Sequence, residues 1–261
     1  MNKYERLADI LDYLEKNEEL LVGDACSLFN SSAATIRRDF NYLFQKNKVE
    51  KTWGGISKAK ETPSDELVRT LEQREIDNLD QKISIAEYAA TLVKDGDVVI
   101  LDGGTTTLQM IPFLIKKKIQ LITNSLLIAH RIDEISERFE FELFVTGGFV
   151  YPRSGMLVGS QVSNSIKDFN AKWFIMSVGG ISSEGLFNSN ALVVDTEKDM
   201  IKRSEKFIVL ADHTKIGKRD SVKLCDLRTP DIIITDSGYL DLDSELKGIL
   251  QVESLHVVKS K

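Results

Sequence analysis

Thr35-Ile36-Arg37-Arg38-Asp39 is the stretch that decides how the N-terminal part of this 261-residue chain folds. It lies inside a helix predicted over residues 33–45, because apolar side chains recur there every three or four residues. The hydroxyl of Ser32 is placed to cap that helix, and a polar turn at residues 30–32 separates it from a helix predicted over residues 24–29. The side chains expected to face inward are Ala25, Leu28, Phe29, Ile36, Phe40, Leu43 and Phe44. Two helices joined in this way have the organisation of a helix-turn-helix.

The second helix and the segment after it are rich in positive charge. Residues 35–58 contain two arginines and four lysines, against only Asp39 and Glu50. Residues 49–53 alternate in polarity and end at Gly54-Gly55, which is typical of one strand of a β-hairpin, or wing. The second helix of a helix-turn-helix enters the major groove of DNA, where arginines contact phosphates and guanine edges. The predicted DNA-binding residues are Ser32, Thr35, Arg37, Arg38, Asn41 and Lys51.

An alternative interpretation of Arg37-Arg38 is a solvated helix face whose arginines pair with nearby acids. The capped helix, the preceding helix, the basic hairpin and the terminal Gly-Gly occur together, and this combination favours DNA binding. Asp39 is expected to be a structural partner, for instance of an arginine, because a carboxylate that faces phosphates is repelled.

From residue 82 onward, apolar β-rich runs alternate with helical patterns. This alternation predicts an α/β domain with a largely parallel sheet. The predicted strands are residues 98–101, 119–122, 141–145, 173–178, 207–210, 232–234 and 255–258. The predicted helices are residues 83–93, 108–115, 127–135, 195–204 and 242–250. Polar residues 57–81 are expected to form a linker and connecting helix between a domain at residues 1–56 and a domain at residues 82–261.

Several of these strands end in small or polar residues. The C-terminal ends of parallel strands line one crevice, and ligands bind there. Gly103-Gly104 lets the backbone approach a ligand, and the threonines that follow begin a helix whose free N–H groups attract an anion such as phosphate. These threonines could also merely cap the helix, and Lys215 could be either a counter-charge to phosphate or an ordinary surface lysine. The predicted effector-binding residues are Asp102, Gly103, Gly104, Thr105, Thr106, Thr107, Thr123, Asn124, Ser125 and Lys215.

Composition narrows the classes of protein. The net charge of −6 argues against a protein that coats nucleic acid nonspecifically, although a local basic face is still allowed. The apolar runs are too short to span a membrane and the N-terminus does not resemble a signal peptide, so we expect a cytoplasmic protein. Cys26 and Cys225 form no CxxC pair and the histidines are scattered. We therefore predict neither a metal site nor a cofactor.

The chain resembles the DeoR family of bacterial transcription regulators over nearly its whole length. The resemblance is carried by the Thr-Ile-Arg-Arg-Asp run, Gly54-Gly55, Asp102-Gly103-Gly104-Thr105-Thr106, Thr123-Asn124-Ser125, and Asp212 with Lys215. It implies a winged helix-turn-helix joined to a sensor domain with the fold of ribose-5-phosphate isomerase and glucosamine-6-phosphate deaminase. It also implies sensing of a phosphorylated sugar or sugar-derived intermediate. The usual role in the family is repression of a carbohydrate-use operon by a homo-oligomer bound to double-stranded operator DNA.

This chain departs from the family pattern in the wing. Lys51 stands where arginine is usual, and Trp53 where histidine or tyrosine is usual. The operator sequence is therefore not carried over from the family.

The main rival is an enzyme, a sugar-phosphate isomerase or deaminase with an appended DNA-binding module. Such an enzyme needs a general acid or base near the substrate carbonyl. Asp102, Asp195, Glu197 and Asp212 are available, but their spacing alone does not assemble them. A third class, a plain interaction module, would not need the polar strand ends. We therefore expect a regulator without catalytic residues.

Overall fold

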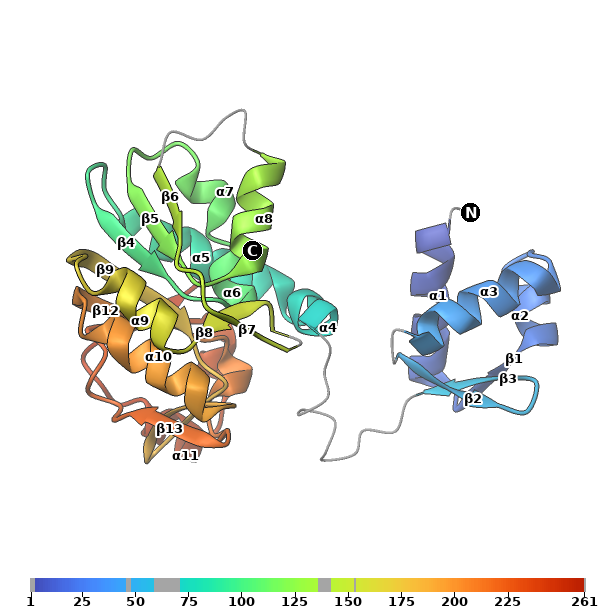
Figure 1. Cartoon of the computed structure of the whole chain (residues 1–261). Helices are drawn as coiled ribbons and strands as arrows, with labels where there is room; N and C mark the ends of the chain where they lie inside the picture. The colour runs from blue at the N-terminus through green and yellow to red at the C-terminus, as the bar shows by residue number, and fades with distance from the viewer. Residues whose placement is uncertain (1–2, 46–47, 59–70, 136–141, 153, 261) are drawn as a thin grey trace. The chain divides into compact units, whose positions relative to one another are not determined.

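The computed structural model describes residues 3–45, 48–58, 71–135, 142–152 and 154–260. The chain divides into two compact units, residues 1–69 and 70–261 (Figure 1). No helix in the described ranges combines the length and the apolar character that crossing a bilayer requires.

The N-terminal unit combines helices with a three-stranded antiparallel sheet. Its elements are α1 (Lys3–Lys16), β1 (Glu19–Leu21), α2 (Val22–Leu28), α3 (Ala33–Gln45), β2 (Val49–Thr52) and β3 (Gly55–Lys58). Strand β3 lies between β1 and β2 and pairs with both. A single buried cluster joins Ile10 of α1, Leu20 of β1, Ile36 of α3 and Ile56 of β3. The β2–β3 hairpin that follows α3 is the wing of a winged helix-turn-helix.

The predicted helix over residues 33–45 is confirmed at both ends, whereas the helix before it begins at Val22 instead of residue 24. Two side chains expected to face inward do not. Leu28, the last residue of α2, is 54% exposed, and Phe44, near the end of α3, is 40% exposed. The Phe44 ring lies beneath the Lys51 ammonium, 4.4 Å from ring centroid to nitrogen, so it forms a cation–π contact at the surface.

The C-terminal unit is built on a seven-stranded sheet of order β15-β14-β12-β9-β4-β5-β6, and all neighbouring pairs in it are parallel. Its strands are β4 (Val98–Leu101), β5 (Gln120–Thr123), β6 (Glu142–Val145), β9 (Ala171–Ser177), β12 (Ser204–Leu210), β14 (Ile232–Asp236) and β15 (Leu255–Val258). Each lies at, or within a few residues of, a predicted strand, so the expectation of a mostly parallel α/β domain is confirmed.

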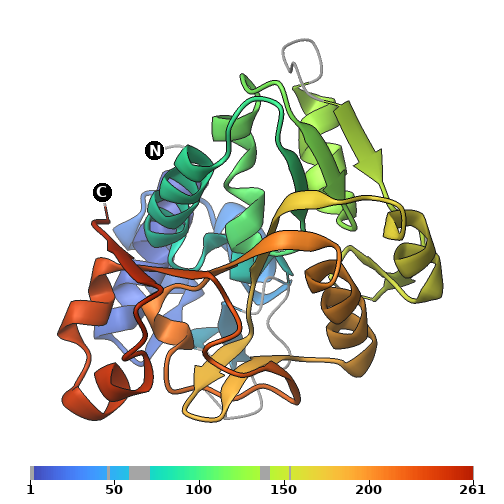
Figure 2. The same cartoon turned by 90° about the vertical axis from the view of Figure 1, so that its left-hand side faces the viewer.

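Helices cover both faces of this sheet (Figures 1 and 2). They are α4 (Leu71–Ile76), α5 (Leu79–Leu92), α6 (Thr105–Leu108), α7 (Ile111–Leu114), α8 (Leu126–Glu134), α9 (Ser160–Ile166), α10 (Ala191–Ile201) and α11 (Ser244–Ile249), with 3-10 turns η3 (His213–Lys215) and η4 (Ser237–Asp241). Successive residues of β4 alternate between the faces, since Val99 and Leu101 belong to one buried cluster and Ile100 to the other. The first cluster includes α5, α7 and α8, and the second includes α9 and α10.

Three predicted helices differ from the structure, and one of them, expected over residues 83–93, begins at Leu79. The helix expected over residues 108–115 is divided into α6 and α7, because Pro112 has no N–H to donate to the carbonyl of Leu108. The helix expected over residues 195–204 begins at Ala191, where the Asn190 side chain caps it by accepting from Leu192 N at 2.8 Å. The apolar residues 191–194, which lie outside the predicted helix, therefore belong to it.

Helix α9 and two small antiparallel sheets were not predicted. The sheets pair β7 (Phe149–Tyr151) with β8 (Met156–Val158), and β11 (Gly185–Asn188) with both β10 (Gly180–Ser182) and β13 (Val222–Cys225). These strands have three or four residues each, too few for an alternating pattern to be recognised.

Candidate functional sites

The exposed face of α3 carries the predicted DNA contacts. Ile36 is fully buried, and this anchors the helix while Arg37, Arg38 and Asn41 are exposed. In the part of the chain that the structure describes, neither arginine has an acidic partner, which disfavours the interpretation as a paired, solvated face. The Oγ of Ser32 accepts from Thr35 N at 3.3 Å and lies 2.9 Å from Thr35 Oγ1, so the predicted cap is confirmed.

Asp39 faces away from that surface. Its Oδ2 accepts from Arg6 Nε at 2.6 Å, and the two side chains are 3% and 10% exposed. The expectation that Asp39 pairs with an arginine is confirmed, and the partner is on α1. This buried ion pair fixes α3 to α1 and so fixes the direction of Arg37 and Arg38.

The tip of the wing presents one aromatic side chain. Trp53 lies between β2 and β3 and is 100% exposed. Gly54 adopts a φ of +93°, and a Cβ on Gly55 would collide with the backbone of Leu20. Glycine is thus required at the two positions for different reasons: Gly54 allows the turn, and Gly55 allows the close approach to β1. The turn they form presents Trp53 to solvent. The predicted DNA contacts include Lys51 but not Trp53, although the position of this aromatic residue directly before Gly-Gly places it at the tip of the hairpin.

The loop after β4 leads directly into α6. The first helical hydrogen bond of α6 joins Leu108 N to Gly104 O at 3.0 Å. The N–H groups of Thr105, Thr106 and Thr107 lie in the first turn, before that bond, and so have no carbonyl of the helix to donate to. Thr107 Oγ1 donates to the carbonyls of Asp102 and Gly104, at 2.8 and 3.0 Å. No hydrogen bond among the described residues uses the hydroxyl of Thr105 or Thr106. Thr107 therefore braces the loop, whereas the hydroxyls of Thr105 and Thr106 have no hydrogen-bond partner among the described residues.

The remaining residues of this predicted site brace the loops. Thr123 Oγ1 donates to Leu101 O at 2.7 Å, and Ser125 Oγ caps α8 by accepting from Ile128 N at 3.2 Å. Asn124 accepts from Gly103 N at 3.1 Å and donates to Leu157 O at 3.3 Å. Their side chains are buried, and their polar groups are engaged with the protein.

The glycines of the loop are required by packing. A Cβ on Gly104 would collide with Ser177 Oγ of β9, and a Cβ on Gly103 would come within 2.7 Å of Met156 Cγ of β8. From the sequence, these glycines were expected to let the backbone approach a ligand. In the structure, the groups that approach them closely are side chains of the neighbouring strands β8 and β9.

Asp102 and a residue from α10 form a buried acidic pair. Asp102 is 0% and Glu197 1% exposed. Within the described ranges, both carboxyl oxygens of Asp102 and the Oε2 of Glu197 lack a hydrogen-bond partner. Burial raises the pKa of Asp102 to about 7. The Asn124 side chain and the Gly103 N–H lie beside Asp102 and oppose this shift in part, although the Gly103 N–H itself donates to Asn124 Oδ1. Burial also raises the pKa of Glu197 well above its usual value, and the nearby Asp102 raises it further.

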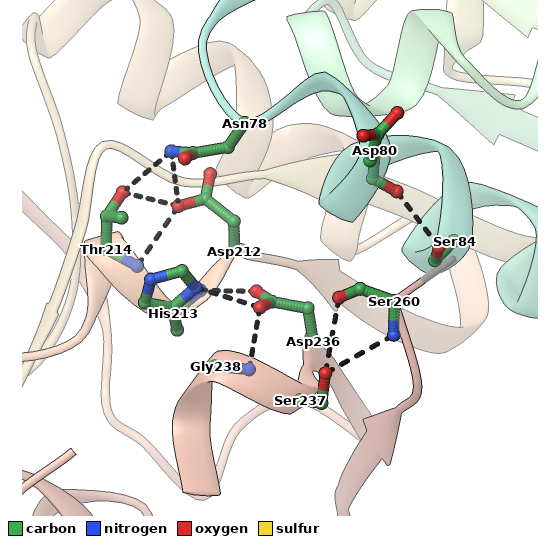
Figure 3. A network of polar contacts seen from close by, with 10 residues as sticks. All are labelled: Asn78, Asp80, Ser84, Asp212, His213, Thr214, Asp236, Ser237, Gly238 and Ser260. Carbon is green, nitrogen blue, oxygen red and sulfur yellow. Dashed lines mark hydrogen bonds and ion pairs between the residues drawn. The ribbon is translucent and has the colours of Figure 1, made fainter. Parts of the chain in front are cut away.

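A network of polar contacts ties the start of α5 to the ends of β12 and β14 (Figure 3). Asn78, in the left-handed conformation with φ +52°, donates to Asp212 Oδ1 and Thr214 Oγ1, both at 3.5 Å. His213 Nδ1 lies 2.8 Å from Asp236 Oδ2, and its backbone N–H donates to Asp236 Oδ1 at 2.7 Å. A cavity of about 460 Å³ adjoins His213 and Asp236. The polar ends of the two strands were noticed in the sequence as part of a ligand crevice, but their spacing did not indicate which of these residues contact one another.

Positive groups gather beside Asp212. Lys82 is 4% exposed, and its ammonium donates to the carbonyls of Arg74 and of Asp77, the latter at 2.5 Å. Burial lowers the pKa of Lys82 to about 8; Asp212 opposes this shift, and Lys215 and Arg74 add to it. Lys215, the predicted counter-charge, is therefore close to Lys82. The carbonyls that Lys82 holds belong to the end of α4, which directly follows residues 59–70.

Comparisons with known proteins cover both units. A family model described as the DeoR-like helix-turn-helix domain matches residues 6–62, and one described as the DeoR C terminal sensor domain matches residues 77–237. The transcriptional regulator IolR of Bacillus subtilis is 30% identical over 83% of this chain and 84% of its own length. The transcriptional repressor GlcR of the same organism is 30% identical over 90% of this chain and 89% of its own. A ribose 5-phosphate isomerase A from Methanocaldococcus jannaschii aligns over 53% of this chain and 55% of its own, with 19% identity and a TM-score of 0.39.

Proposed function

Because this chain belongs to the DeoR family of transcription regulators, we propose that it represses a carbohydrate-use operon, and that a phosphorylated sugar or related intermediate controls its affinity for operator DNA. The observation that carries the effector assignment is the loop at residues 102–107. It offers unused hydroxyls on Thr105 and Thr106 and free N–H groups at the start of α6. A phosphate group is satisfied by such donors.

The proposed DNA contacts are the predicted set, to which the exposed Trp53 is added. Arg37 and Arg38 lie on the exposed face of a helix whose opposite face is anchored by Ile36 and Asp39. Their guanidinium groups are held for contact with phosphates and base edges without a competing acid among the described residues. We propose that the protein acts as a homo-oligomer, so that paired recognition helices read two half-sites.

Alanine substitution of Arg37 or Arg38 is expected to weaken operator binding by roughly 1–3 kcal/mol, or about 5- to 150-fold, because each loses a charge-assisted contact. Fluorescence anisotropy with labelled operator DNA, taken from mapped genomic sites, measures this loss. Lys16→Ala is the matched control, since Lys16 is an exposed basic residue of the same unit, at the end of α1. An equal loss in Lys16→Ala would indicate nonspecific charge attraction and not a recognition helix.

The proposed route from effector to DNA runs through α4. Lys82 holds the carbonyl end of α4, and Lys215 and Asp212 lie close to Lys82. An anion that binds near Lys215 changes the electrostatic balance around Lys82 and so the position that α4 prefers. The effector shifts this equilibrium only by its different affinities for the two states.

Lys215→Ala and Thr106→Ala are each expected to lower the affinity for a bound sugar phosphate by about tenfold or more, because each removes a charged or hydroxyl partner. Isothermal titration calorimetry of the full chain against a panel of sugar phosphates measures this. Lys206→Ala and Thr91→Ala are controls, since Lys206 pairs with Asp231 at the other end of β12 and Thr91 is exposed on α5. Unchanged affinity in both test variants would rule out the phosphate assignment.

The enzyme alternative is separated from this proposal by a turnover assay. The relatives are named as transcription regulators. Incubation of the full chain with ribose 5-phosphate or glucosamine 6-phosphate is expected to yield no product, and sustained turnover would favour the enzyme.

A further inference from the structure

Phe44 connects the recognition helix α3 to the wing. It follows Arg37 by seven residues and Asn41 by three, so these three side chains lie along one face of the helix. The Lys51 ammonium of β2 lies 4.4 Å from the centroid of the Phe44 ring, and an ammonium is attracted to the face of an aromatic ring. One buried cluster also joins α3 to both strands of the wing. The wing is therefore held in a defined position at the end of the exposed face of α3.

Trp53 extends this exposed face beyond Lys51. It is 100% exposed at the tip of the wing, so none of the described side chains covers its indole ring. An indole left in water contributes none of the stability that its burial would supply. Gly54 and Gly55 nevertheless fix a turn that presents the ring to solvent, through a positive φ and a close approach to β1. A ring presented in this way indicates a partner outside the chain.

The charges around Trp53 favour DNA as that partner. The two arginines of α3 and Lys51 are exposed, whereas Asp39 is buried in its ion pair. The side chain of Glu50 lies on the opposite face of β2 from that of Lys51, because successive residues of a strand alternate. A positive surface of this kind attracts a polyanion. The uncharged indole then has a role different from that of the arginines, since its flat faces pack on sugars and bases.

The dimensions of DNA indicate which groove receives the ring. The major groove is about 12 Å wide and admits an α-helix, whereas the minor groove is about 6 Å wide. One phosphate backbone separates the two grooves, and Lys51 lies between the Phe44 ring of α3 and the tip of the wing. With α3 in the major groove and Lys51 on that backbone, Trp53 reaches the adjacent minor groove. Apolar side chains placed there press between base steps, and pyrimidine–purine steps yield most easily.

We propose that Trp53 is a wedge that enters the minor groove beside the segment read by α3, and that it makes operator affinity depend on how easily the DNA deforms there. This inference rests on the proposed function, because it assumes that α3 docks in the major groove of an operator. The wing thereby has a specificity of its own. The arginines read base edges, whereas Trp53 responds to the shape of base pairs that α3 does not contact.

Fluorescence anisotropy of the full chain with operator DNA from mapped genomic sites tests the wedge. Trp53→Ala is expected to weaken binding by about tenfold, whereas Trp53→Phe keeps a flat apolar ring and should retain most of the affinity. The slope of log affinity against log salt concentration should stay unchanged in Trp53→Ala, because no phosphate contact is lost. The same slope should become shallower by about 1 in Lys51→Ala.

Two further measurements locate the ring. Replacing each operator adenine in turn by 2,6-diaminopurine adds an amino group to the minor groove alone. At a position beside the segment read by α3, this change should weaken wild-type protein and leave Trp53→Ala unaffected. Trp173→Phe leaves Trp53 as the only tryptophan, because the chain has two and Trp173 is in the C-terminal unit. The fluorescence of Trp53 should be quenched when this variant binds the operator.

The other outcomes overturn the inference in distinguishable ways. If Trp53→Ala binds the operator as tightly as wild-type protein, the ring does not contribute to binding, and the proposed function still stands. If 2,6-diaminopurine weakens both proteins equally at every position, the ring contacts DNA outside the minor groove. If wild-type protein binds no operator, the proposed function fails and the inference fails with it. The thermal midpoint of Trp53→Ala should equal that of wild-type protein, and a lower midpoint would assign the ring to structure instead.

Discussion

Asp39→Ala is expected to lower the free energy of unfolding of the N-terminal unit by about 3–5 kcal/mol, because it leaves the Arg6 guanidinium buried without its carboxylate. A loss of this size is comparable with the whole stability of a small domain. The variant should therefore lose operator binding even though Asp39 is turned away from the DNA-binding face. Differential scanning calorimetry of the full chain should show the transition of this unit moved to lower temperature or absent.

Two variants separate this effect from a lost DNA contact. Arg37→Ala is expected to weaken DNA binding while leaving the transition in place. The double variant Arg6→Leu/Asp39→Leu is expected to recover much of the stability, since it removes both buried charges and keeps apolar volume. If Asp39→Ala kept the transition of wild-type protein and still lost DNA binding, Asp39 would be a DNA contact.

The second large effect concerns Asp102 and depends on pH. An ordinary aspartate has a pKa of 3.8, and burial raises that of Asp102 to about 7. Between these values the unfolded chain has released a proton that the folded chain keeps, so this group favours unfolding increasingly as pH rises, until pH exceeds the folded pKa. Asp102→Asn carries no charge in either state. Its stability relative to wild-type protein should therefore rise by roughly 2–3 kcal/mol between pH 5 and pH 8.

Urea unfolding of the full chain at pH 5 and pH 8 measures this difference for the C-terminal unit. Asp195→Asn is the control and should give the same small difference at both pH values, since its carboxylate is in solvent. A constant difference between Asp102→Asn and wild-type protein at the two pH values would mean that Asp102 keeps the same charge in both states. The acidic pair would then need a counter-charge that the described residues do not provide.

Local patterns predicted the regular parts of both units. The bounds of α3, its cap at Ser32 and the burial of Ile36 follow from the spacing of apolar side chains and one hydroxyl. The strands of the large sheet were predicted because buried parallel strands are continuous apolar runs. Pro112, the second residue of α7, was also present in the sequence, and the break before α7 was missed because the apolar spacing continues through it.

For the proposed effector site, the sequence indicated candidate residues but not which of their polar groups the fold itself uses. The threonines after Gly104 were identified together, but the fold uses Thr107 as a brace and leaves the hydroxyls of Thr105 and Thr106 unused. Asn124 and Ser125 were among the predicted effector-binding residues, yet the loops engage their polar groups. Which polar side chain remains available depends on the backbone groups that pass beside it, and these come from other strands.

The sequence by itself determined that this chain has a helix-turn-helix with outward arginines and a parallel α/β unit, because periodicity and capping act over a few residues. Only the tertiary structure decided that Asp39 pairs with Arg6, 33 residues away, that Lys82 holds the end of α4, and that Glu197 meets Asp102. The physical reason is that charge and burial are set by whatever surrounds a group in space, and those neighbours come from distant parts of the chain.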